Sequence, residues 1–115
     1  MIRVLLDENL PRKLKWPLDA DALTVPERGW GGISNGRLLR LAASEFDVLL
    51  TMDRGMMYQQ NLGGVDLCLI VLSAVSNDID DLLPLVPTIN TVLRDARPGL
   101  VLHVQAPDGL DEPGG

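Results

Sequence analysis

Residues 1–11, MIRVLLDENLP, decide the fold of this chain. Residues 2–6 form a short, largely apolar run rich in strand formers, which is typical of a strand buried on both faces of a parallel sheet. The carboxylates of Asp7 and Glu8 follow this run directly. Open α/β sheets place their ligand sites at the carboxyl ends of strands, so the stretch predicts a central strand and one half of a functional site.

Residues 46–55, FDVLLTMDRG, repeat the same design. The expected strand covers 47–51, and Thr51 and Asp53 lie at its carboxyl end. Because the ends of parallel strands converge on one edge of a sheet, we expect Asp53 and the first pair of acids to form one site. This requires the first strand to lie between the second and the third.

Apolar runs and helical patterns alternate along the rest of the chain, which predicts a parallel sheet with helices on both faces. The expected strands are 2–6, 22–25, 47–51, 67–72 and 100–104. The expected helices are 10–16 with Asn9 as its cap, 36–45 with Ser34 or Asn35 as its cap, a short helix or turn at 54–62, and a last helix from Pro84 or Pro87 to about Ala96. The expected core contains Leu38, Leu41, Leu49, Leu50, Leu69, Val71, Leu93 and Val101.

The bulk composition favours one small α/β domain. The 115 residues are expected to form a domain over 1–104 and a flexible acidic tail over 105–115. The single cysteine, Cys68, excludes an intramolecular disulfide and fits a cytoplasmic location; we expect it to be an inert core thiol. No signal peptide is visible, and the longest apolar run is too short to span a bilayer, so no membrane association is expected. The net charge of −6 argues against a protein that coats nucleic acids.

Carboxylates gathered in a cleft have two common uses: they bind a hard cation such as Mg²⁺ or Mn²⁺, or they act as an acid and a base. The only histidine, His103, falls inside an expected strand, which favours a structural role. The chain has no phosphate-binding loop and no zinc-type spacing of cysteine and histidine. Trp30 either stacks on a base or, as we favour, packs its loop onto the sheet edge.

Two family resemblances compete. Acids after the first strand, Asp53 after the third and Ser73-Ala74 after the fourth resemble the receiver domains of response regulators. That resemblance implies a phospho-acceptor signalling domain with Asp53 as the acceptor. Receivers carry a lysine at the end of the fifth strand, whereas this chain has no lysine after Lys15.

The second resemblance is closer and covers essentially residues 1–104. LLDENLP at 5–11, GWGG-x-x-NG-x-LL-x-LA at 29–42, FDVLLT-x-DR at 46–54 and YQQNL at 58–62 resemble the small bacterial PIN-like proteins. These are relatives of PIN-domain ribonucleases and of toxin–antitoxin toxins. The resemblance implies a Rossmann-like three-layer α/β/α sandwich with a mostly parallel five-stranded sheet, and Mg²⁺- or Mn²⁺-dependent hydrolysis of RNA.

Carried over to this chain, the resemblance implies that Asp7, Glu8 and Asp53 are catalytic and that Asp7 and Asp53 bind the metal. The implied supporting or substrate-binding residues are Asn9, Asn35, Arg37, Thr51, Arg54 and Gln60. RNA would be the substrate. A small antitoxin-like protein is an implied partner, and a homodimer is compatible with the pattern.

The chain also departs from the PIN-like pattern. Related sequences often have acids where Gly36, Arg37 and Gly55 stand here, so three acids remain in place of four or five. This leaves three hypotheses: an active nuclease, a nuclease with a degraded site, and a non-catalytic module that binds RNA or protein. Arg37 either reaches the remaining carboxylates or is a solvated helix residue.

Overall fold

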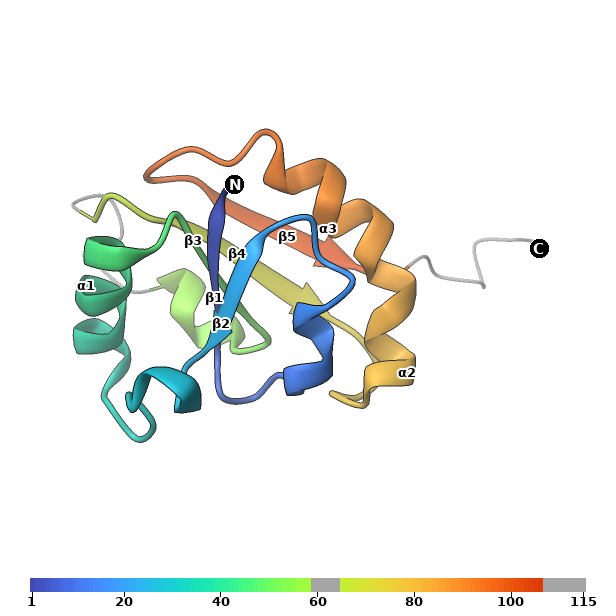
Figure 1. Ribbon diagram of the computed structural model, residues 1–115, viewed down its shortest axis with the longest axis horizontal. Helices are drawn as coiled ribbons and strands as arrows, with labels where there is room; N and C mark the ends of the chain where they lie inside the picture. Colours follow the sequence, from blue (N-terminus) through green and yellow to red (C-terminus); the bar gives the residue numbers. More distant parts are fainter. Residues whose placement is uncertain (59–64, 107–115) are drawn as a thin grey trace.

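A five-stranded parallel sheet lies at the centre of the computed structural model, which describes residues 1–58 and 65–106 (Figure 1). The strands run in the order β2-β1-β3-β4-β5, which places the first strand between the second and the third, as predicted. Their bounds differ from the predicted ones by no more than one residue: β1 Arg3–Leu6, β2 Asp21–Thr24, β3 Val48–Thr51, β4 Cys68–Ser73 and β5 Val101–Gln105.

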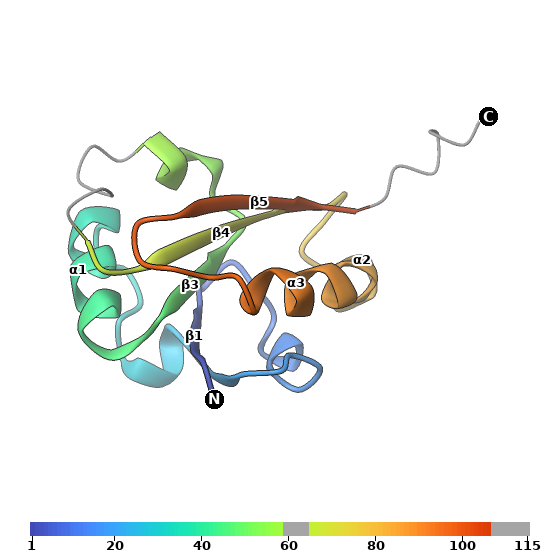
Figure 2. The same cartoon turned by 90° about the horizontal axis from the view of Figure 1, so that it is seen from above.

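Helical segments cover both faces of the sheet, so the predicted three-layer α/β/α sandwich is confirmed (Figures 1 and 2). One face carries α1 (Asn35–Glu45) and the 3-10 turn η3 (Arg54–Tyr58). The other face carries η1 (Arg12–Lys15), α2 (Ile79–Leu82), η5 (Leu83–Leu85) and α3 (Val86–Leu93). A further 3-10 turn, η2 (Pro26–Arg28), follows β2.

The central strands are buried on both faces because almost every side chain in them is apolar. Successive strand residues point to opposite faces. Leu6 and Leu50 therefore pack with Ile89 of α3, whereas Leu5 and Leu49 pack with Leu38 of α1. Two apolar cores result, one on each side of the sheet.

Six of the eight predicted core residues are buried, and two predictions are wrong. Leu41 is partly exposed because Leu38, Leu39 and Ala42 form the buried side of α1. Val101 is 36% exposed. It pairs with Leu69 and so shares the face that α1 covers, but β5 is an edge strand with a neighbour on one side only.

The first helix is shorter than predicted and lacks the predicted cap. Only η1 forms, with Pro11 at its N-cap and no side-chain capping bond. The side chain of Asn9 instead contacts the end of β3, as described below. Trp16, the C-cap residue of η1, is 70% exposed.

The last helical stretch begins earlier than predicted, at Ile79, and it is divided into three segments. Pro84 and Pro87 each lie in the first turn of a new segment, η5 and α3. A proline is tolerated there because its missing N–H is not needed for a helical hydrogen bond. Both prolines are therefore accommodated without breaking a helical hydrogen bond. The last segment, α3, ends at Leu93.

Within residues 1–58 and 65–106, no helix has the length and apolar character needed to cross a bilayer. Gln60, most of the YQQNL motif and the tail from 107 lie outside the described residues.

Candidate functional site

The carboxyl ends of β1 and β3 lie side by side at the point where the strand order reverses. From β1 the chain crosses to β2 on one side, and it later enters β3 on the other side. In open α/β sheets this switch point is where ligands bind. Asp7 directly follows β1, its N–H donates to the Leu50 carbonyl at 2.9 Å, and Asp53 follows β3. The two predicted halves of the site are therefore adjacent.

The hydroxyl of Thr51 joins the two strand ends. It donates to Asp7 Oδ2 at 2.7 Å and accepts from the Asp53 N–H at 3.0 Å and from Asn9 Nδ2 at 3.3 Å. One donor and two acceptor positions are all that a hydroxyl offers, so Thr51 Oγ1 is saturated. The Thr51 residue is fully buried. Its position therefore determines where both aspartates lie.

Asp7 is 5% exposed, and both of its oxygens accept hydrogen bonds. Oδ1 accepts from the Glu8 N–H at 2.8 Å, and Oδ2 accepts from Thr51. Burial raises the pKa of Asp7, the two hydrogen bonds lower it, and the nearby carboxylates of Glu8 and Asp53 raise it further; the net pKa is above the ordinary value. The fold thus holds a carboxyl group where its negative charge is disfavoured.

Asp53 is half-buried and is held by two contacts from different elements. Its Oδ2 accepts from Asn35 Nδ2 at the start of α1, at 3.2 Å, and its Oδ1 accepts from the Gly55 N–H at 2.8 Å. A Cβ at position 55 would lie 3.0 Å from Asp53 Oδ1. An acidic residue at position 55 would therefore require Asp53 to shift.

The Glu8 carboxylate lies near enough to raise the pKa of Asp7, but its hydrogen bond is to the glycine loop and not to the carboxylate pair, Asp7 and Asp53. Its Oε1 accepts a long hydrogen bond of 3.5 Å from the Gly32 N–H, and a Cβ at Gly31 would come within 3.4 Å of its Oε2. Among residues 1–58 and 65–106, no three histidine, cysteine, aspartate or glutamate side chains are arranged to hold a metal ion. The structure therefore brings together two of the three predicted acids.

Of the predicted supporting residues, Asn9, Asn35 and Thr51 contact the carboxylate pair or the residues that hold it. Arg37 is exposed and forms no ion pair with any described residue. It therefore occupies the position of a solvated helix residue, and the structure does not show it neutralising the carboxylates.

Arg54 belongs to a contact group that the sequence did not reveal. Its Nη2 donates to Ser73 Oγ at 3.3 Å, and Ser73 Oγ lies 2.7 Å from His103 Nε2. His103 is exposed on the edge strand β5, so the prediction that it is a structural histidine inside the sheet missed this setting. The pairing of β4 with β5 brings Ser73 beside His103, and Arg54 reaches Ser73 from η3.

Trp30 packs its loop onto the domain, as predicted. Its ring meets Phe46 edge to face, with 6.2 Å between the ring centroids, and the Arg28 guanidinium lies 4.5 Å from the Trp30 ring centroid. Phe46 belongs to the core beneath α1. Trp30 thereby positions the glycine loop that contacts Glu8.

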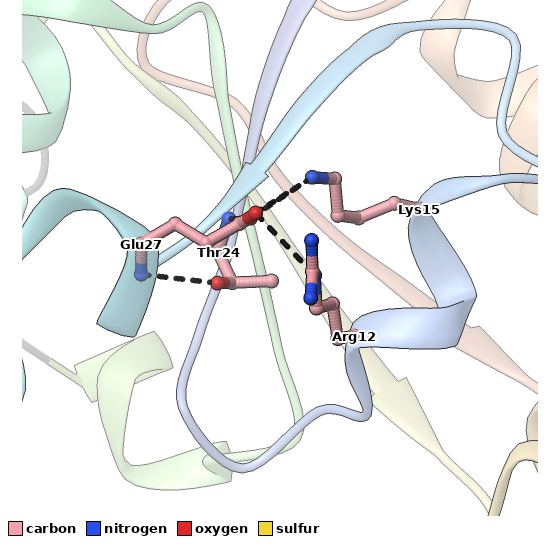
Figure 3. A network of polar contacts seen from close by, with 4 residues as sticks. All are labelled: Arg12, Lys15, Thr24 and Glu27. Carbon is pink, nitrogen blue, oxygen red and sulfur yellow. Dashed lines mark hydrogen bonds and ion pairs between the residues drawn. The ribbon is translucent and has the colours of Figure 1, made fainter.

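A second polar cluster, formed by Arg12, Lys15, Thr24 and Glu27, lies at the carboxyl end of β2 (Figure 3). Lys15 Nζ lies 3.0 Å from both carboxylate oxygens of Glu27, and the Arg12 Nε lies 3.4 Å from one of them. Glu27 also accepts from the Thr24 N–H at 2.9 Å. The hydrogen bond from Lys15, followed by that from Thr24, lowers the pKa of Glu27 to about 2. These contacts join η1 to η2 and satisfy Glu27 within the fold.

Comparisons of this chain with protein-family models, with curated proteins and with solved structures gave no match.

Proposed function

We propose that this protein is a PIN-like, metal-dependent ribonuclease of low activity, with Asp7 and Asp53 as ligands of one Mg²⁺ or Mn²⁺ ion. The observation that carries the proposal is the pair of carboxylates at the switch point, held through the buried hydroxyl of Thr51. The choice of RNA as substrate follows the resemblance of the LLDENLP and FDVLLT-x-DR stretches to PIN-like proteins.

The residues present fit a cation that keeps most of its water. Mg²⁺ is commonly bound by one or two carboxylates and retains several waters. Each oxygen of Asp7 and of Asp53 accepts one hydrogen bond, which leaves one further acceptor position on each. A divalent ion would also offset the burial and the like charges that raise the pKa of Asp7. The set thus suits one ion better than two.

When bound, the ion would polarise the phosphate and lower the pKa of a water that attacks it. The protein's own contribution is positional. Thr51 orients Asp7, and Asn35 orients Asp53 from the start of α1. Asp7 must lose its proton before it can bind a cation, so metal and proton compete for this residue. With Glu8 turned toward the Gly31 loop and Gly55 in place of an acid, fewer carboxylates are available, which is the reason for expecting low activity.

A receiver-like role is the second candidate, because Asp53 follows β3 in a sheet of order β2-β1-β3-β4-β5 and Ser73 ends β4. Two observations weigh against it. Asp53 already accepts from Gly55 and Asn35, and β5 reads VLHVQ without a lysine to contact a phosphoryl group.

Thermal unfolding with increasing Mn²⁺ tests the proposal. The wild-type protein should be stabilised by about 2.7 kcal/mol when Mn²⁺ reaches a hundred times its dissociation constant. Asp7→Asn and Asp53→Asn should remove this effect together with Mn²⁺-dependent cleavage of a labelled RNA. Asp95→Asn, at an exposed aspartate beyond α3, is the matched control and should retain both.

The proposal fails if millimolar Mn²⁺ neither stabilises the protein nor supports RNA cleavage. It also fails if Asp95→Asn loses the effects as fully as Asp53→Asn does. A stable phosphoryl adduct on Asp53 after treatment with acetyl phosphate would establish the receiver-like role instead.

A further inference from the structure

Three polar side chains from three elements meet beside the carboxylate pair. Arg54 comes from η3, Ser73 from the end of β4 and His103 from β5. Ser73 Oγ is 3.3 Å from Arg54 Nη2 and 2.7 Å from His103 Nε2. We call these residues the Arg54 group.

The sheet register brings the Arg54 group onto one open surface. Val71 pairs with His103, so these two side chains share a face, and Ser73 lies two residues further along β4 on that same face. On that face β5 presents Val101, His103 and Gln105, all of them exposed. Within the part of the chain that the structure describes, these three side chains remain exposed on the edge strand of the sheet.

The group also lies at the same edge of the sheet as the carboxylate pair. Arg54 directly follows Asp53 in the chain, and Thr51 pairs with Val71, two residues before Ser73. A ligand that contacts Asp53 would therefore have the Arg54 group as its nearest neighbour on the β4 side.

The partners of Arg54 leave its charge available. Four other cations of the described residues, Arg3, Arg12, Lys15 and Arg28, form ion pairs with carboxylates. Arg54 is instead held by a neutral hydroxyl, and no carboxylate of the described residues contacts Arg54 or His103. A guanidinium has five N–H donors, and one contact to Ser73 leaves most of them free.

The combination suits a phosphate. Arginine binds phosphate oxygens through two parallel hydrogen bonds, and a serine hydroxyl and an imidazole can add further donors. The protein as a whole carries a net charge of −6, so its overall field does not attract polyanions. Any phosphate bound at this edge must therefore be held by local contacts such as these.

We propose that Arg54, Ser73 and His103 bind a phosphodiester of single-stranded RNA, the one next to the phosphate that a metal ion at Asp7 and Asp53 would contact. The identity of the ligand as RNA rests on the proposed function. The recognition itself depends on the Arg54 group alone and needs no metal.

Binding of a fluorescently labelled single-stranded oligouridylate, followed by anisotropy in EDTA at several salt concentrations, tests this site. Arg54→Ala should weaken binding about tenfold. It should also reduce the slope of log K against log salt by about 0.7, the value for one lost phosphate contact on a single strand. Ser73→Ala and His103→Ala should each weaken binding by a smaller factor. Arg94→Ala removes an equally exposed arginine at the end of α3 and should change nothing.

The proposal is overturned if the wild-type protein does not bind the oligouridylate, if Arg54→Ala binds it as well as wild type, or if Arg94→Ala weakens binding equally. Inorganic phosphate that shifts the His103 resonances without any binding of the oligouridylate would show a site for free phosphate, which also overturns the RNA assignment. Absence of Mn²⁺-dependent cleavage together with Arg54-dependent binding in EDTA would refute the nuclease alone. The two proposals are thus tested separately.

Discussion

Replacing Thr51 by valine tests the central contact of the candidate site. Valine keeps the branched shape of the side chain and removes the hydroxyl, so three hydrogen bonds are lost at once. The half-exposed Asn9 can turn to water, but Asp7 Oδ2 and the Asp53 N–H lose their partner. Each of these two unsatisfied groups costs about 1–3 kcal/mol, so the free energy of unfolding should fall by about 2–6 kcal/mol.

The loss should also depend on pH. Burial raises the pKa of Asp7, and the hydrogen bond from Thr51 lowers it, so the substitution raises this pKa further. A native pKa above the unfolded value means that the native state holds the proton more tightly. The contribution of Asp7 to the free energy of unfolding is then fully present below the pKa that Asp7 has in the unfolded chain. It is lost as the pH rises through the pKa that Asp7 has in the native state. Thr51→Val should therefore cost more at pH 7.5 than at pH 5, by about 1.4 kcal/mol for each unit of additional pKa increase within that range.

Urea denaturation at pH 5 and pH 7.5 measures both effects. Thr51→Ser keeps the hydroxyl and should lose only about 1 kcal/mol, the cost of one buried methyl group. Thr91→Val is the matched control, since the Thr91 hydroxyl donates to the Pro87 carbonyl on an exposed face of α3; it should change stability by less than about 0.5 kcal/mol. An equal loss at the two pH values, or a loss no larger than that of Thr91→Val, would refute the reasoning.

Four further results are expected. The contribution of Asp7 to stability should grow as the pH falls from 7 toward the ordinary aspartate pKa of 3.8, and Asp7→Asn should remove this contribution in the same urea titrations; an unchanged pH dependence would exclude Asp7 as its source. Leu49→Ala and Leu69→Ala, at fully buried sites of the core beneath α1, should each cost about 2–5 kcal/mol, whereas Val101→Ala should cost less than about 1 kcal/mol; equal costs would contradict the assigned edge. Gly55→Ala places a Cβ 3.0 Å from Asp53 Oδ1 and should reduce the stabilisation by Mn²⁺ in thermal melts. Gly29→Ala is strained by the φ of 75° at this position but has no atom near its Cβ, so it should lower the melting temperature and leave the stabilisation by Mn²⁺ unchanged. In a carboxyl-detected NMR titration Glu27 should show a pKa of about 2, and Lys15→Met should raise it toward 4.5, because the Lys15 hydrogen bond is the largest cause of the shift; a titration unaffected by Lys15→Met would contradict this.

Much of this fold is predictable from short segments. The runs ending at Leu6, at Thr51 and near Ser73 are apolar on both sides of the pleat, and only a strand covered on both faces buries such a run completely. Helical patterns between the runs require crossovers, so the strands are parallel and their carboxyl ends share an edge. That Asp7 and Asp53 lie at the same edge of the sheet follows from this without knowledge of any side-chain contact, whereas their adjacency also requires β1 and β3 to be neighbours.

The helical segments η1, α2, η5 and α3 were less predictable, because their ends depend on a competition between local sequence preferences and contacts formed in the folded protein. Asn9 is a good capping residue, yet Thr51 and Met52 bind its side chain, and η1 forms without it. Pro84 and Pro87 suggested a later start for the last helix. Burial of Leu82, Leu85 and Ile89 against the sheet outweighs that local preference. A new helical segment begins just before each proline, so both prolines lie in a first turn.

The amino-acid sequence by itself determined the strands and their parallel direction, because these follow from local apolar periodicity and from the geometry that all parallel sheets share. The position of the first strand between the second and the third was predicted by placing Asp7 and Asp53 in one site, and the structure supplied the full strand order. Only the tertiary structure decided that Glu8 turns toward Gly31, that Asn35 rather than Arg37 reaches Asp53, and that Ser73 joins Arg54 to His103. The direction of a side chain depends on the register of the strands and on neighbours far away in the chain. Residues 19 to 30 positions apart meet in the Arg54 group, and no local pattern encodes such a meeting.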